Sequence, residues 1–87
     1  MIKHNYLSFR VAHKVLAILH RDGSLNVTEI TKRLSINGAN IHPVLNELLR
    51  RELVSKLHSG RITMVSLTDK SVGEAMYKVM VSVGEVL

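Results

Sequence analysis

Residues 53–68, LVSKLHSGRITMVSLT, limit the possible folds of this chain more than any other stretch. Before this stretch the apolar residues recur every three or four positions, whereas inside it they alternate with polar residues. The first spacing indicates amphipathic helices and the second indicates strands. Ser59-Gly60, in the middle of the stretch, predicts a two-residue hairpin turn. We therefore expect an α+β protein in which several helices precede one β-hairpin.

A turn at Ser59-Gly60 also predicts the register of the hairpin, with His58 opposite Arg61. One face of the hairpin is then apolar and carries Leu53, Leu57, Ile62 and Met64. The other face is basic and polar near the tip and carries Lys56, His58, Arg61 and Thr63. We expect the apolar face to be buried on the core and the basic face to be exposed.

Two helices are predicted in the first third of the chain. The first is expected over residues 8–21, with Ser8 as its N-cap and Asp22-Gly23 as its stop signal. The second is expected over residues 26–34, because Asn26 followed by Glu29 is close to a capping box. A tight turn at residues 35–38 should follow.

Residues 36–54, INGANIHPVLNELLRRELV, predict a third helix with two different faces. Its leucine-rich rear half should pack on the core, whereas its front half is small and polar. Pro43 would break a helix interior, because it lacks an N–H group and its ring clashes with the preceding turn, but it is harmless in the first turn. We therefore expect the helix to start near Asn40, with Asn37 or Asn40 as its cap.

A last helix is expected from about residue 68 or 71 onward. Its apolar residues are spaced by four, three, four and three, as in an a/d seam, and are Val72, Met76, Val79, Val83 and Val86. This seam could pack on the core of its own domain or join two copies of the chain. We favour a homodimer, because the segment is more apolar than one small domain can cover.

The charge of the chain is unevenly distributed. Residues 1–62 contain ten Lys and Arg but four Asp and Glu, whereas residues 63–87 contain two and three. A basic body indicates an anionic partner. The chain has no cysteine, which excludes disulfides and cysteine nucleophiles and is typical of a reducing compartment. No stretch approaches the roughly 18–20 apolar residues of a membrane span, so we expect a cytoplasmic protein without membrane contact.

The order of helix, helix, tight turn, helix, basic hairpin and helix resembles that of the winged helix-turn-helix transcription regulators, particularly the MarR- and ArsR-like proteins. Residues 26–54 resemble their helix-turn-helix, and residues 59–71, SGRITMVSLTDKS, resemble their wing. Glu52 and Ser71 stand where these proteins usually have glycine. The resemblance implies a winged helix-turn-helix DNA-binding domain over residues 1–68 and a C-terminal dimerisation helix over residues 69–87 of the same unit.

The resemblance also implies a homodimer that binds double-stranded DNA at an inverted-repeat operator and regulates transcription. An asparagine can pair with adenine through two hydrogen bonds, and small side chains allow close approach to the bases. The candidate residues of the recognition helix are Ala39, Asn40, His42, Pro43 and Asn46. The candidates for phosphate and wing contacts are Lys32, Arg33, Arg50, Lys56, His58 and Arg61.

Plainer interpretations stand beside these assignments. Basic residues on helices are often only solvated, Arg51 can pair with Glu47 four residues earlier, and Asn40 can act only as a cap. His13 and His20 lie on one helix face and could hold a metal, but one helix supplies only two ligands. We therefore expect no metal and no cofactor.

Two other functional classes have less support in the sequence. The sequence contains no nucleophile elbow, phosphate loop, zinc-protease motif or carboxylate pair in an apolar frame, so we do not expect an enzyme. The alternative function is a winged-helix protein–protein interaction module without DNA contact. The basic body argues against this alternative.

Overall fold

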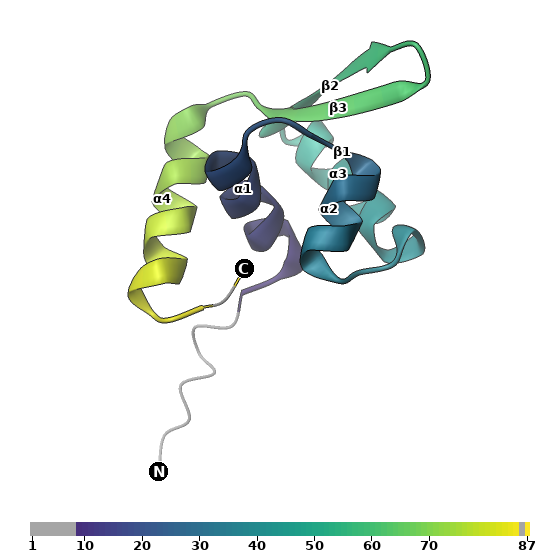
Figure 1. Cartoon of the computed structure of the whole chain (residues 1–87). Helices are drawn as coiled ribbons and strands as arrows, with labels where there is room; N and C mark the ends of the chain where they lie inside the picture. Colours follow the sequence, from purple (N-terminus) through teal and green to yellow (C-terminus); the bar gives the residue numbers. More distant parts are fainter. Residues whose placement is uncertain (1–8, 86) are drawn as a thin grey trace.

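The computed structural model describes residues 9–85 and 87, which form four helices and a three-stranded antiparallel sheet (Figure 1). The elements in order are α1 (Val11–Asp22), β1 (Leu25–Asn26), α2 (Val27–Leu34), α3 (Gly38–Arg50), β2 (Val54–Ser59), β3 (Ile62–Leu67) and α4 (Lys70–Ser82). The predicted α+β winged helix-turn-helix fold is confirmed, with β2 and β3 as the wing.

The core surrounds α1, which lies between α4 on one side and α2 and α3 on the other (Figure 1). Its fully buried side chains are aliphatic and come from five elements; the largest are Ile18, Ile30, Ile41, Leu45, Met80, Val15 and Val65. No polar or charged residue is buried among the described residues. The fold is therefore held mainly by the burial of aliphatic surface.

The hairpin turn lies one residue later than predicted, and each residue's cross-strand partner therefore shifts by two positions. Ser59 pairs with Ile62 and Leu57 with Met64, so the two turn residues are Gly60 and Arg61 rather than Ser59 and Gly60. Gly60 has φ +63°, and a positive φ at the first central position is the pattern of a type II′ turn, which favours glycine there. Because side chains alternate between the faces with a period of two, this shift leaves Leu57, Ile62 and Met64 together on one face.

The predicted burial of the wing is wrong, because the other face of the hairpin packs on the core. Val54 and Val65 face the core and are buried, whereas Leu57 is 68% exposed and Ile62 is 52% exposed. Strand β1, which is not predicted from the sequence, is part of the reason why the face with Val54 and Val65 is buried. Leu25 pairs with Val65 in the sheet and is buried with it, so the Val65 face gains a second apolar partner that the Ile62 face lacks.

The helix ends in the first half of the chain are mostly as predicted. Helix α1 ends at Asp22, followed by Gly23 as expected, but it begins at Val11 rather than near residue 8. The proposed N-cap Ser8 lies outside the described residues. Helix α2 is capped by Asn26, whose Oδ1 accepts a hydrogen bond from the Glu29 N–H at 2.8 Å, which confirms that prediction.

Helix α4 packs along α1 and ends earlier than the predicted seam requires. Gly73 is buried in this contact, where an added Cβ would lie 3.1 Å from the Leu16 carbonyl oxygen. The helix ends at Ser82, and Val83 follows it as C-cap. The predicted helical stripe is therefore not continuous through Val83, and Val86 lies outside the described residues.

Candidate nucleic-acid interface

Helix α3 has the rear and front predicted from its sequence. Ile41, Leu45 and Leu48 recur at intervals of four and three and are buried, which fixes the rear of the helix to the core. Exposed on the front are Ala39, Asn40, His42, Pro43 and Asn46. A rigid helix with an exposed face of small and hydrogen-bonding side chains can enter a major groove.

The start of α3 decides between two assignments left open by the sequence. The Asn37 side chain accepts a hydrogen bond from the Asn40 N–H at 3.0 Å, so Asn37 is the N-cap. The Asn40 side chain is thereby left for other contacts. The helix begins at Gly38, so Pro43 lies in its second turn, and its predicted place in the first turn is wrong. Because proline has no N–H group, the carbonyl of Ala39 lacks the usual helical donor.

Two arginines at the end of α3 share one carboxylate. Glu47 contacts Arg50 and Arg51, each at 2.5 Å. The hydrogen bond from Arg50 has the largest effect and that from Arg51 the next, and together they lower the pKa of the Glu47 carboxyl group from 4.5 to about 2. The pairing of Arg51 with Glu47 agrees with the plainer interpretation given above. Arg50 is on the exposed side of α3 but is already partly neutralised.

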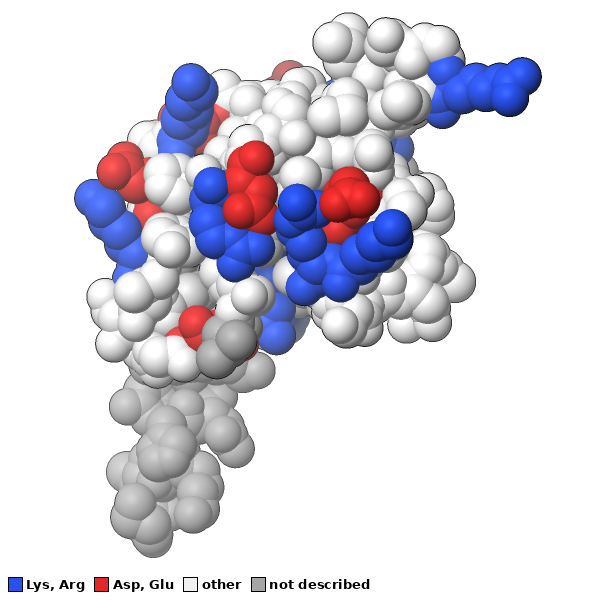
Figure 2. Space-filling model, viewed as in Figure 1, with Lys and Arg blue, Asp and Glu red and all other residues white. Residues whose placement is uncertain are grey.

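The tip of the wing carries positive charge without a neighbouring acid. Figure 2 shows basic and acidic side chains side by side over the body of the protein, but a basic side chain without an acidic neighbour at the wing tip. Lys56 and Arg61 take part in none of the ion pairs found among the described residues. His58 bonds across the hairpin to Thr63 at 2.8 Å. The wing is thus a source of uncompensated cations.

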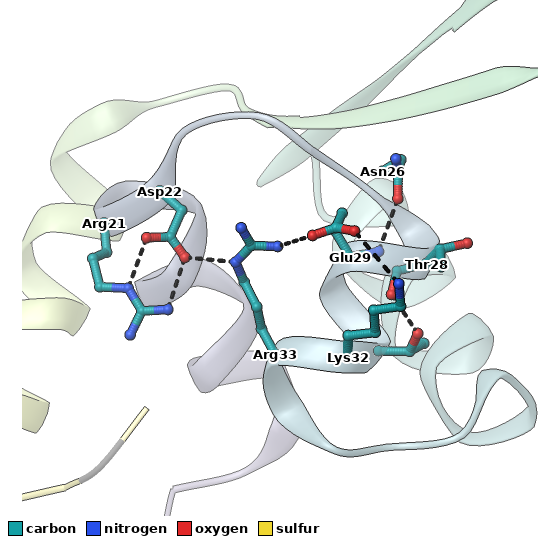
Figure 3. A network of polar contacts seen from close by, with 8 residues as sticks. Arg21, Asp22, Asn26, Thr28, Glu29, Lys32 and Arg33 are labelled. Carbon is teal, nitrogen blue, oxygen red and sulfur yellow. Dashed lines mark hydrogen bonds and ion pairs between the residues drawn. The ribbon is translucent and has the colours of Figure 1, made fainter.

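The two basic residues of α2 differ from each other. Arg33 donates to Asp22 at 3.0 Å and to Glu29 at 2.5 Å, so its guanidinium lies between two carboxylates (Figure 3). The Nζ atom of Lys32 lies 4.0 Å from the Glu29 carboxylate, which is a loose ion pair, and its side chain is mostly exposed. Lys32 can therefore turn toward a partner, whereas Arg33 is engaged within the protein.

The turn that leads into α3 and the tip of the wing lie on the same side of the molecule, toward the right of the view in Figure 1. Between the wing tip and the start of α2 is a cavity of about 240 Å³, to which Arg61 contributes. The sequence carries no signal for this cavity and predicts its lining residue Asn26 only as a cap.

The proposed dimerisation residues fall into two groups. Val72 and Met76 pack against the protein's own core. Val79 and Val83 are each 46% exposed. The structure thus supports packing on the domain for the first pair and leaves the second pair available for another copy.

The two histidines of α1 have local partners. The Nδ1 atom of His13 accepts a hydrogen bond from the Arg10 N–H at 3.0 Å. The centroid of the His20 ring lies 5.4 Å from the centroid of the Tyr77 ring. Within residues 9–85 and 87 there is no group of three or more metal-ligating side chains. No helix in this part of the chain has the length and apolarity needed to cross a membrane.

Several solved structures resemble this one. YusO from Bacillus subtilis is 26% identical, with a TM-score of 0.66 over 83% of this chain and 57% of that one. The adhesin competence repressor AdcR from Streptococcus pyogenes is 18% identical, with a TM-score of 0.79 over 91% and 62%. MepR, a transcription regulator of the Staphylococcus aureus multidrug efflux pump MepA, is 19% identical, with a TM-score of 0.74 over 91% and 62%. The chain therefore spans about 57–62% of the length of these three proteins.

The comparison with curated proteins gives no match. The comparison with family models gives one that covers more than half of the chain. Residues 10–61, from the start of α1 to the tip of the wing, match the model of the MarR family. The match includes the helix-turn-helix and the core that holds it. On this match and the shared winged-helix fold, the chain belongs to the MarR family.

Proposed function

We propose that this protein is a cytoplasmic transcription regulator, not an enzyme, that binds double-stranded DNA sequence-specifically as a homodimer. The observation that carries the proposal is the exposed polar front of α3, with Asn40, His42 and Asn46, on a helix whose start lies on the same side of the molecule as the wing tip (Figure 1). Burial of the opposite face, with Ile41, Leu45 and Leu48, fixes the helix that carries these side chains. MarR-family membership supports DNA-binding regulation as the general activity.

In this proposal α3 enters the major groove. Asn40 and Asn46 can each offer an amide to adenine, and His42 can donate to or accept from a base edge. Ala39 and Pro43 give apolar contact, for which a thymine methyl group is the matching partner. Two copies would place their helices in successive major grooves about 34 Å apart, which requires an inverted-repeat operator.

Phosphate contacts would come first from the cations that the protein does not neutralise itself. Arg61, Lys56 and Lys32 meet this condition best. His58 and Arg50 can add contacts, although the latter must share its charge with Glu47. With six to eight basic groups engaged per dimer, the logarithm of the binding constant should fall with log salt at a slope of roughly −5 to −7.

The dimer would form through α4, so that residues 1–68 bind DNA and residues 69–87 join the subunits within one folded unit. Val79 and Val83 supply the exposed apolar surface. A domain of this size buries only about 60–65% of its unfolded surface, and association adds to that burial.

The test is selection of bound duplexes from a random library, followed by anisotropy titration of the best duplex and a random duplex at several salt concentrations. An enriched inverted repeat, a steep salt slope and loss of discrimination in Asn40→Ala are expected. The contrary result is absent or salt-independent binding, which would favour a protein-interaction module.

A further inference from the structure

The cavity between the wing tip and the start of α2 has a lining suited to an anion. Its volume is about 240 Å³, and its lining residues are Asn26, Val27, Thr28, Arg61, Ile62 and Thr63. The lining includes a guanidinium, an amide and two hydroxyls but no carboxylate. Two aliphatic side chains complete it. A ligand that accepts several hydrogen bonds, carries negative charge and has an apolar edge matches this chemistry.

Three of the four polar side chains in the lining have donor groups that the protein does not use, whereas the Thr63 hydroxyl is bonded to His58. Asn26 caps α2 with its Oδ1 atom, which leaves the Nδ2 group on the side away from the helix, toward the sheet in Figure 3. An amide nitrogen can only donate. Within the described part of the chain, the Thr28 hydroxyl and the Arg61 guanidinium form no side-chain hydrogen bond or ion pair.

The position of the cavity matches one part of a DNA duplex. If α3 lies in a major groove and the wing reaches the adjacent minor groove, the sugar-phosphate strand between the two grooves passes between wing and helix-turn-helix. The cavity lies between these elements, because residues 26–28 belong to the start of the helix-turn-helix and residues 61–63 to the wing.

We propose that this cavity holds a phosphate of the DNA backbone. Arg61 and Asn26 donate to the phosphate oxygens together with the Thr28 hydroxyl, and Val27 and Ile62 contact the adjoining sugar. The inference rests on the proposed function and extends it, because it assigns Asn26 and Thr28 to DNA binding. The phosphate would also fix the wing relative to α2, so the register of the protein on the duplex would depend on it.

The test uses substitutions that keep the α2 cap. Asn26→Asp and Asn26→Ser both retain a capping oxygen, but the first places a carboxylate beside the phosphate. Thr28→Val removes one hydroxyl at nearly constant volume. Arg10→Gln, before the start of α1, lowers the net charge by the same amount away from the cavity. Anisotropy titrations on the selected operator and on a random duplex measure affinity, and circular dichroism confirms that each variant is folded.

Thr28→Val should weaken binding on the order of tenfold, the usual effect of losing a hydrogen bond to a charged group. The loss should be equal on both duplexes, because a phosphate carries no sequence information. Asn26→Asp should weaken binding more than Asn26→Ser, and Arg10→Gln should bind nearly like wild type. The proposal is overturned if Asn26→Asp and Thr28→Val bind like wild type, or if their loss is confined to the operator.

An NMR titration of the wild-type protein with inorganic phosphate at constant ionic strength separates two sources of the anion. We expect weak shifts of the amides of residues 26–28 and 61–63, which the duplex then displaces. Tight binding of phosphate that the duplex cannot displace would assign the cavity to a free anion instead. If wild type binds no duplex, the proposed function fails. If wild type binds duplex but the cavity variants do not behave as expected, only the assignment of the cavity fails.

Discussion

Arg33 lies between two carboxylates of different helices, with its Nε 3.0 Å from Asp22 and its Nη1 2.5 Å from Glu29. Asp22 ends α1, so this guanidinium connects α1 to α2 (Figure 3). The arginine of the wing tip, Arg61, has no such partner among the described residues. The two arginines should therefore have separate roles, one in stability and one in DNA binding.

Arg61→Gln should weaken binding to every duplex and reduce the steepness of the salt slope by about 1 for each lost phosphate contact. Arg33→Gln should instead lower the free energy of unfolding by about 1 kcal/mol or less, because its ion pairs are partly exposed. Salt-dependent anisotropy and urea unfolding of both variants measure the two effects. An unchanged slope in Arg61→Gln would count against the wing contact.

Glu47→Gln should strengthen binding to random duplex. The substitution removes the carboxylate shared by Arg50 and Arg51, which leaves both guanidinium groups free for phosphates. The salt slope should become steeper, and discrimination between operator and random duplex should fall. Glu74→Gln, which removes an exposed carboxylate from α4, is the matched control. Equal effects of the two substitutions would show that only net charge matters.

The lowered pKa of Glu47 predicts part of the loss of folding stability in acid. The hydrogen bonds from Arg50 and Arg51 lower the pKa of Glu47 to about 2 in the folded protein, compared with an ordinary value of 4.5. A carboxyl group whose pKa is lower in the folded state stabilises the protein above pH 4.5, and this stabilisation is lost as the pH falls toward 2. Urea unfolding between pH 6 and 2 should show a shallower decline for Glu47→Gln than for wild type. Parallel curves would contradict the pKa shift.

Glu52 has a backbone conformation that favours glycine. Its φ is +60°, and a side chain in this left-handed region costs roughly 1 kcal/mol or more. Glu52→Gly should therefore raise the melting temperature, with a gain of about 0.5–1 kcal/mol after the greater flexibility of the unfolded chain is subtracted. Glu74→Gly, within helix α4, should destabilise by a similar amount. A lower melting temperature for Glu52→Gly would refute this account.

Val79→Asp should give a folded monomer. Val79 is 46% exposed on α4, so the charge is tolerated by the single subunit but not by an apolar interface. Val81→Asp, at a site 54% exposed and about 200° around the helix, is the control. Analytical ultracentrifugation reports the subunit number and circular dichroism the fold. A dimer that survives Val79→Asp but not Val81→Asp would place the interface on the other side of α4.

The elements and the polar front of α3 could be predicted because their causes are local. Asn26 caps α2 through a residue three positions away, and the spacing of Ile41, Leu45 and Leu48 repeats within one or two helical turns. The helix-forming and strand-forming periods are likewise visible within a few residues. These features also carried the resemblance to winged helix-turn-helix regulators, which the family match bears out.

Features that depend on distant residues could be decided only by the tertiary structure. The wing faces inward with Val65 rather than with Ile62, because Leu25, forty residues earlier, adds a strand beside it. Arg33 is neutralised by a carboxylate eleven residues away. Arg61 and the start of α2 line the same cavity only in the folded chain. Alternation shows that a strand has two faces, but the free energy of burial selects one of them, and that depends on which partners the whole chain brings to it.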